Sequence, residues 1–256
     1  MFRGKPRKVM TLDELPTWSV AGPDSLADHP IPAGTKPKFE PNAIINSKVS
    51  FWMRGDSSSL AADAIVNAAN SGLHPGGGIC GVIHSAAGPE LATACEKVSP
   101  CPTGGAALTP GFKLPAKYVI HAVGPIGEKP DKLESAYKST LNYIDGEKIR
   151  SVGLCCISTG IYGYPITPAT HVALNTVRQW LEDKTNQEHT DRVIFVVFEP
   201  RDVNVYYNLV HTYFPLSKEE LEKSSAEPEE EGEPKKEEKP KKETPKEEES
   251  KDETKE

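Results

Sequence analysis

The chain has 256 residues, of which 37% are hydrophobic and 26% are charged, which is enough for one well-packed core or at most two small ones. No stretch approaches 18 consecutive apolar residues, so we expect no membrane span. The formal net charge of −7 lies in residues 217–256, which hold 17 acidic residues and 10 lysines and leave the rest of the chain neutral. A neutral body argues against general nucleic-acid binding, so any anion site must be local.

Composition divides the chain into three regions. Residues 1–45 are rich in proline, and we interpret them as an extended arm with a short helix at 12–15 that packs on the body. Residues 46–216 carry the apolar patterns of a folded domain. Residues 217–256 repeat lysine, glutamate and proline, which predicts a disordered acidic tail that is either a solvated spacer or a site for an unidentified partner.

The N-terminus and the cysteines bear on the compartment. The first ten residues are basic but contain no apolar stretch of the kind that secretory signals carry. The five cysteines form neither a CxxC pair nor an even set, which favours a reducing cytoplasmic or nuclear environment.

Within the body, short apolar runs alternate with helical patterns. In chain order we predict strands over residues 48–53, 62–66, 117–123, 151–157 and 192–198. The predicted helices span residues 80–97, 132–144, 168–181 and 203–213, the third with Thr167 as N-cap. This alternation predicts an α/β fold, a three-layer α/β/α sandwich around a mostly parallel mixed sheet.

The most informative segment follows the second predicted strand. Asn67 and Asn70 come at or just after the end of that strand, a triple glycine occupies positions 76–78, and a helix of small residues begins near Ile79. Glycine amides beside a helix N-terminus form an anion site, and asparagine side chains suit sugar hydroxyls. The combination favours a nucleotide-like ligand.

A second glycine-containing loop, residues 158–165, follows the strand over 151–157, and Phe198 ends the last strand. Ligands bind beyond the carboxyl ends of parallel strands. Two such loops at one edge of the sheet could hold a diphosphate from both sides, with Phe198 against a base.

Several of these segments together resemble the macrodomain family, and more narrowly its MacroD-type branch. The resemblance covers residues 46–215 and rests on Arg54-Gly-Asp56, on residues 63–70, 76–78 and 83–88, and on residues 114–121 and 157–164. It implies an ADP-ribose pocket and removal of mono-ADP-ribose from acidic protein side chains, or deacetylation of O-acetyl-ADP-ribose, with neither a cofactor nor a metal.

The resemblance also implies roles for individual residues. Asp56 would accept a hydrogen bond from the adenine amino group, Phe198 would contact the adenine face, and Asn70 would bind the distal ribose. The expected ligand-binding set is Asp56, Ser57, Ala69, Asn70, Gly76, Gly77, Gly78, Ile79, Cys80, Gly81, Ser158, Thr159, Gly160, Ile161, Tyr162, Gly163, Tyr164 and Phe198.

Cys80 departs from the family pattern, because MacroD-type enzymes usually have an aspartate there. A thiol is a poorer general base at neutral pH than a carboxylate. Asn70 and Cys80 remain the candidate catalytic residues, and the alternative route uses the ligand's own phosphate and Asn70 to position water. Catalysis by Cys80 as a nucleophile is a further alternative.

Other residues have structural explanations that we prefer. Asn67, His84 and His121 are expected to be packed or hydrogen-bonded, and Cys155 and Cys156 to belong to the core. His74, Cys80 and His84 carry metal-binding groups, but their spacing lacks the compact ligand set of a zinc site, so we expect no metal.

Three function classes follow. The first is a hydrolase, the second is a reader that binds ADP-ribose without turnover, and the third is a phosphatase for ADP-ribose 1″-phosphate. The expected partners are ADP-ribose and mono-ADP-ribosylated proteins, and the chain is expected to be a monomer.

Overall fold

The structure, a computed structural model, describes residues 8–223. The chain divides into two compact units, residues 1–225 and 226–256, and the second unit lies entirely outside the described residues. The predicted disorder of residues 224–256 therefore stays a prediction, as does the interpretation of residues 1–7.

A mixed sheet of six strands forms the centre of the domain. In spatial order the strands are β2 (Val49–Met53), β8 (Arg192–Val197), β7 (Ser151–Leu154), β4 (Ala64–Ala68), β6 (Tyr118–Ala122) and β5 (Ala106–Pro110). Neighbouring strands are parallel except β5, which runs antiparallel to β6 at the edge. The five predicted strands are present. The edge strand β5 was missed, because Ala-Ala-Leu-Thr-Pro is short and carries little of the β-branched and aromatic character of a strand.

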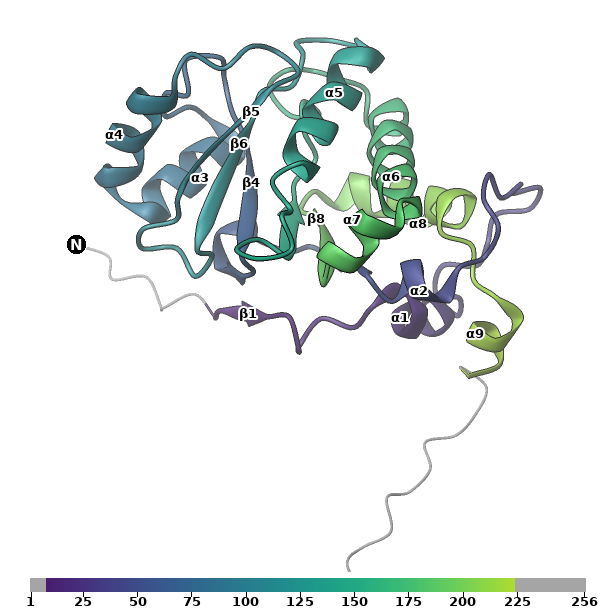
Figure 1. Ribbon diagram of the computed structural model, residues 1–256. Coiled ribbons are helices and arrows are strands. Elements are labelled where there is room, and N and C mark those ends of the chain that lie inside the picture. Colours follow the sequence, from purple (N-terminus) through teal and green to yellow (C-terminus); the bar gives the residue numbers. More distant parts are fainter. Residues whose placement is uncertain (1–7, 224–256) are drawn as a thin grey trace, which may run out of the picture. The chain divides into compact units, whose positions relative to one another are not determined.

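Helices cover both faces of the sheet, which confirms the three-layer α/β/α architecture (Figure 1). One face carries α5 (Pro130–Leu141), α6 (Ile166–Glu182) and α8 (Pro200–Tyr213). The other carries α3 (Gly78–Ala87) and α4 (Pro89–Val98). A short helix, α7 (Lys184–His189), follows α6.

After its first residue, the sequence of β8 is apolar throughout because the strand is covered by helices on both faces of the sheet. Val193, Phe195 and Val197 pack into the core beneath α5, α6 and α8, whereas Ile194 and Val196 pack into the core beneath α3 and α4. Side chains of successive strand residues point to opposite faces, so a strand covered on both faces is apolar throughout.

Two predicted features of the helices were wrong, and the other predicted helix ends differ from the observed ones by up to three residues. The helix expected over residues 80–97 is two helices, because Gly88 has φ +92°, a left-handed conformation that ends α3 before Pro89 begins α4. Helix α6 begins at Ile166 with Pro165 as its N-cap residue, so Thr167 lies inside the helix rather than capping it.

The N-terminal region packs on the domain through short elements rather than through one helix. Residues 12–15 form a turn instead of the predicted helix, and β1 (Met10–Thr11) pairs with β3 (Leu60–Ala61). Helix α1 (Trp18–Ser25) buries Trp18, whose Nε1 donates to Phe214 O at 2.8 Å.

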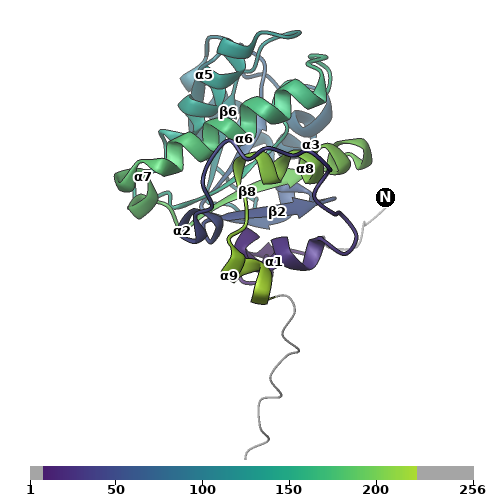
Figure 2. The ribbon, with the colours of Figure 1, turned by 90° about the vertical axis from the view of Figure 1, so that its right-hand side faces the viewer.

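The folded domain extends beyond the predicted boundary at residue 216. Helix α9 (Lys218–Lys223) lies beside α1, close to the edge strand β2 (Figure 2). Its Glu220 is buried and accepts hydrogen bonds from Asn46 Nδ2, at the end of α2 (Ala43–Asn46). These contacts make residues 218–223 part of the fold, which the repetitive composition around them concealed.

Among the described residues, no helix combines the length and apolar character that crossing a membrane requires.

Candidate functional site

A cavity of about 620 Å³ lies at the carboxyl edge of the sheet. Its walls come from the segments that follow β2, β8, β7 and β4, which are consecutive neighbours in the sheet. All of the predicted ligand-binding residues line it except Gly81, Gly163 and Tyr164. The position agrees with the rule that ligands of parallel sheets bind beyond the strand ends.

One end of the cavity is formed after β2 and β8. Asp56 caps the short 3-10 helix η1 (Ser57–Ser59), and its Oδ1 accepts from Ser58 N at 3.0 Å and from Ser58 Oγ at 2.7 Å. Phe198 directly follows β8 and is 61% exposed at the same end. A carboxylate held rigidly beside an exposed aromatic ring suits a base that stacks and donates a hydrogen bond.

The middle of the cavity is formed by the loop after β7. Ser158 adopts a left-handed backbone conformation with φ +68°, and its carbonyl accepts from Tyr164 N at 3.0 Å. Gly124, after β6, lies so close that a Cβ there would collide with Ser158 Oγ. This close approach fixes the start of the loop whose residues 158–162 line the cavity.

The other end is formed after β4 by Asn70 and the triple glycine. Helix α3 begins at Gly78, with Gly77 as N-cap residue, so its unpaired N–H groups lie at the cavity wall. A Cβ built on Gly77 would lie 2.8 Å from Ile161 Cδ1, which shows that the two glycine-containing loops meet across the cavity. Side chains at position 77 would therefore enter the space between the loops.

The Asn70 side chain fixes the loop that carries it. Its Nδ2 donates to His74 O at 2.8 Å and its Oδ1 accepts from His74 N at 3.1 Å. A primary amide has a second N–H and a second acceptor lone pair. Asn70 can therefore hold the loop and also contact a ligand in the cavity.

Cys80 is the third residue of α3 and lines the cavity although only 4% of it is exposed. Its Sγ accepts from Asn67 Nδ2 and lies near His74 O, at 3.7 Å in both cases. The thiol thus takes the place where the family pattern has a carboxylate, at the same end of the cavity as Asn70.

Beneath this end lies a buried polar cluster. Asn67 Nδ2 donates to His121 Nδ1 at 3.1 Å, so His121 Nε2 carries the hydrogen and donates to Thr109 Oγ1 at 2.9 Å. Burial, with a smaller effect of His84, lowers the pKa of His121 to about 4. The expected structural roles of Asn67 and His121 agree with these contacts.

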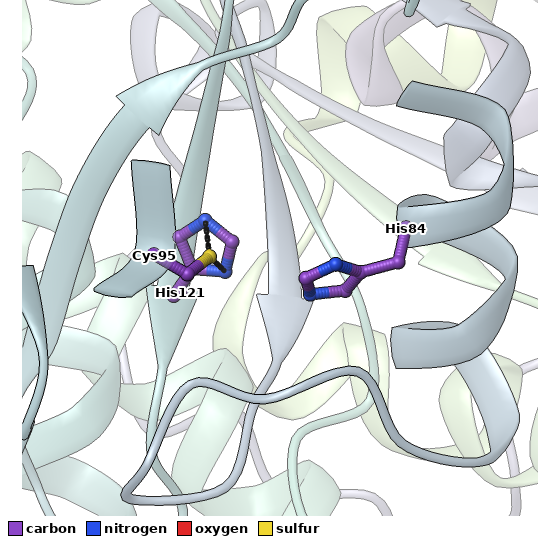
Figure 3. Close-up of side chains that lie close together, drawn as sticks. All are labelled: His84, Cys95 and His121. Atoms are coloured by element: carbon purple, nitrogen blue, oxygen red, sulfur yellow. Dashed lines mark hydrogen bonds between the residues drawn. The ribbon is translucent and has the colours of Figure 1, made fainter. Parts of the chain in front are cut away.

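The structure brings together a different set of metal-binding groups from the one weighed in the sequence. Figure 3 shows His84 directed toward Cys95 and His121, and one ligand atom from each lies within 4.8 Å of the others. Both ring nitrogens of His121 already have hydrogen-bond partners, so a metal ion would have to displace Asn67 or Thr109. His84 has no hydrogen-bond partner among the described residues, and burial lowers its pKa.

Three predicted site residues are not among those that line the cavity, and the structure shows what each does in the fold. A Cβ on Gly81 would lie 2.5 Å from Gly76 O, so this glycine lets α3 pack against the glycine loop. Gly163 has φ +65°, a left-handed conformation that favours glycine, and Tyr164 is 2% exposed within the core. The sequence places these residues next to lining residues but does not show which way they point.

Several lining residues were missed. They are Gly55, Ala68, Val82, Gly124, Cys155, Cys156, Val196, Glu199 and Asp202. Cys155 and Cys156 were assigned to the core, and burial does raise the pKa of each thiol to about 12, yet both reach the cavity wall. For Asp202, the available signal was its place shortly after the last predicted strand; the predicted helix began at residue 203, whereas α8 begins at Pro200 and includes Asp202 in its first turn.

Comparison with known proteins gives a consistent result. The family model described as "Macro domain" matches residues 66–173. The "ADP-ribose glycohydrolase MACROD1" of Bos taurus is 42% identical over 217 residues, which cover 82% of this chain and 64% of the relative. The "ADP-ribose glycohydrolase MACROD2" of Homo sapiens is 45% identical over 193 residues, 73% of this chain and 45% of the relative.

This chain thus spans about two thirds of the first relative and less than half of the second. Among solved structures, the macrodomain of Trypanosoma brucei in complex with ADP-ribose is 37% identical, with a TM-score of 0.66 over 80% of this chain and 78% of that one.

Proposed function

Because the chain belongs to the macrodomain family, we propose that it binds ADP-ribose and removes mono-ADP-ribose from acidic side chains of modified proteins. Deacetylation of O-acetyl-ADP-ribose is a second reaction that the same site would support. We further propose that the chain acts in the cytoplasm or the nucleus, without a metal or cofactor.

The observation that carries this proposal is the order of groups along the cavity. The strand order β2, β8, β7, β4 puts Asp56 and Phe198 at one end, the loop 158–162 in the middle, and Asn70 with the triple glycine at the other end. ADP-ribose has the same order of parts: a base, a diphosphate and a distal ribose. A cavity of about 620 Å³ is within the range usual for such ligands.

The diphosphate would be held without cationic side chains. Among the described residues, none of those that line the cavity is lysine, arginine or histidine. Backbone N–H groups of the two loops and the N-terminus of α3 supply the positive potential instead. This explains how an anion site can exist in a formally neutral domain.

The chemistry at the distal end constrains the mechanism. Of the described lining residues, the carboxylates are Asp56, Glu199 and Asp202, and all three follow β2 or β8, at the base end. The distal end offers the Asn70 amide and the Cys80 thiol. We therefore propose that Asn70 orients the attacking water and that a phosphate oxygen of the bound ligand accepts its proton.

The thiol of Cys80, in place of the aspartate of the family pattern, also favours a second candidate, an ADP-ribose reader with slow or no turnover. Loss of a positioned general base typically lowers a rate by about 10²- to 10⁴-fold. Such a loss leaves binding intact, because the contacts that hold the base and the diphosphate lie elsewhere in the cavity.

A release assay and a binding assay on one sample decide between the two. The protein is incubated with a target carrying ADP-ribose on glutamate or aspartate, and free ADP-ribose is titrated by calorimetry. Release with binding supports the hydrolase, binding alone supports the reader, and the absence of binding would contradict both.

The variant Asn70→Ala tests the assigned role. We expect it to lower release at least about 100-fold, since the water loses its positioning group. Asn142→Ala, an exposed asparagine that follows α5, is the matched control. Release by Asn70→Ala at the rate of the unmodified protein would remove Asn70 from the mechanism.

A further inference from the structure

Asp202 is a buried carboxylate in the cavity wall that the motifs of the sequence did not reveal. It is the third residue of α8, four residues after Phe198 in the chain, at the base end of the cavity. Only 2% of the residue is exposed, although it lines the cavity. A carboxylate in this position needs hydrogen-bond donors, because burying an ionised group without them costs several kcal/mol.

The protein supplies little of what Asp202 needs. Arg201 Nε lies 3.3 Å from Oδ1, but the Arg201 side chain is 67% exposed. Oδ1 has no hydrogen-bond partner among the described residues. Burial raises the pKa of Asp202. The nearby Arg201 guanidinium opposes this rise, and the Glu199 carboxylate adds to it.

Helix capping does not account for the residue. An acidic residue at the third helical position often bonds back to the N-cap residue. The N-cap residue of α8 is Glu199, and the described contacts include no hydrogen bond from its backbone N–H to Asp202. The carboxylate contributes to the helix dipole interaction, but its hydrogen-bonding capacity stays available to the cavity.

The polar groups around Asp202 leave its Oδ1 without a hydrogen bond among the described residues. Cys156 Sγ donates to Tyr206 Oη at 3.7 Å, one turn further along α8, and both groups interact electrostatically with Asp202. Phe198, which also lines the cavity and directly precedes the segment that enters α8, adds apolar surface at this end. A flat, largely apolar group that presents an N–H or O–H would satisfy both the carboxylate and its neighbours.

We propose that Asp202 accepts a hydrogen bond from the adenosine half of the bound ligand and makes the cavity selective for ligands that carry this donor. The donor is the exocyclic amino group of the base or a hydroxyl of the ribose next to it. The inference rests on the proposed function, since it assigns the base end of an ADP-ribose cavity. It gives the adenosine a second carboxyl acceptor in addition to Asp56.

A double-mutant cycle between protein and ligand tests the assignment. ADP-ribose is compared with the analogue that lacks the 6-amino group and with the analogue that lacks the 2′-hydroxyl of the adenosine ribose. Affinities are measured by calorimetry for the unmodified protein and for Asp202→Ala. A hydrogen bond to a charged group corresponds to about tenfold or more in affinity.

We expect the unmodified protein to bind one analogue at least about tenfold more weakly than ADP-ribose, and Asp202→Ala to have lost most of that discrimination. The analogue affected identifies the donor. Asp202→Asn keeps an acceptor oxygen and should retain part of the discrimination, and it replaces the alanine variant if that variant does not fold. Asp131→Ala, which removes an exposed acid from the first turn of α5, should leave all the ratios unchanged.

The outcomes separate the two claims. If the unmodified protein binds ADP-ribose but its discrimination against both analogues is the same in Asp202→Ala and Asp202→Asn, Asp202 serves only α8 and the inference is wrong. If the unmodified protein does not bind ADP-ribose, the proposed function fails, and this inference fails with it.

Discussion

Replacing Cys80 by aspartate would place a carboxylate at the end of the cavity where the described lining residues offer none. Position 80 is the third residue of α3, beside Asn70 and the triple glycine. If the missing group is what limits turnover, this change should raise the rate of release without a new contact to the base or the diphosphate.

The magnitude follows from two opposing effects. A positioned general base contributes about 10² to 10⁴ in rate, which is about 3 to 5 kcal/mol of transition-state stabilisation. Position 80 is 4% exposed, so the new carboxylate loses solvation. Asn67 Nδ2, 3.7 Å from the present sulfur, and the N-terminus of α3 offset part of that loss, the helix by about 0.3 to 2 kcal/mol. We expect a gain near 100-fold and a lower melting temperature.

The assay is single-turnover release from a target modified on glutamate, run beside calorimetry with ADP-ribose. Cys80→Asn is the matched control, because asparagine has the shape of aspartate but no basic oxygen. A gain in Cys80→Asp that is absent in Cys80→Asn assigns the effect to the charge. No gain in the single-turnover rate of Cys80→Asp at saturating protein would refute the reasoning and show that water activation does not depend on position 80.

Three further predictions address binding, the domain boundary and pH. Gly77→Glu should weaken ADP-ribose binding at least about 100-fold, because the new side chain enters the space between the two loops and its charge repels the diphosphate. Glu220→Ala should lower the free energy of unfolding by about 1 to 3 kcal/mol, because Asn46 loses its buried acceptor. Burial lowers the pKa of His121 and of His211 to about 4. As the pH falls below about 6.5, these histidines therefore bind protons in the unfolded chain before they do so in the folded protein. Stability should then fall between pH 6.5 and 4, by up to about 3 kcal/mol for each histidine.

Each of these has a clear contrary result. Calorimetry that finds unchanged affinity in Gly77→Glu would take the glycine loop out of the diphosphate site. Urea unfolding that does not distinguish Glu220→Ala from the unmodified protein would mean that α9 adds nothing to the domain. For the pH prediction, His211→Phe should reduce the loss of stability below pH 6.5, and an identical pH profile would contradict the assignment to buried histidines.

The sequence predicted the strands and the glycine loop correctly, because a local residue pattern determines each of them. Five of the six sheet strands were predicted because each contains a short run of apolar residues. Strand β8 is apolar on both faces because it lies between two helical layers. The glycine loop was found because three glycines directly precede a helical pattern, and the structure shows one reason for glycine there in the left-handed conformation of Gly78, with φ +59°. These requirements act on single residues and their neighbours, so they are visible in the sequence.

The sequence did not show which residues near the cavity line it and which pack elsewhere. Gly81, Gly163 and Tyr164 adjoin lining residues but do not line the cavity. Cys156 was assigned to the core and Asp202 was given no role, yet both line it. The direction of each depends on how α3 and α8 pack against the sheet. That packing is set by contacts between residues distant in the chain, which no local pattern encodes.

The distribution of charge along the cavity bears directly on its chemistry. The lining carboxylates of the described chain gather where the base would lie, and none of the described lining residues at the distal end carries a formal charge. A carboxylate at position 80 would therefore add a base and also add repulsion toward the nearer phosphate. The two effects separate experimentally, because repulsion weakens ADP-ribose binding whereas general-base catalysis changes the rate of release at saturation. A Cys80→Asp variant that releases faster but binds ADP-ribose more weakly is the result that this charge distribution predicts.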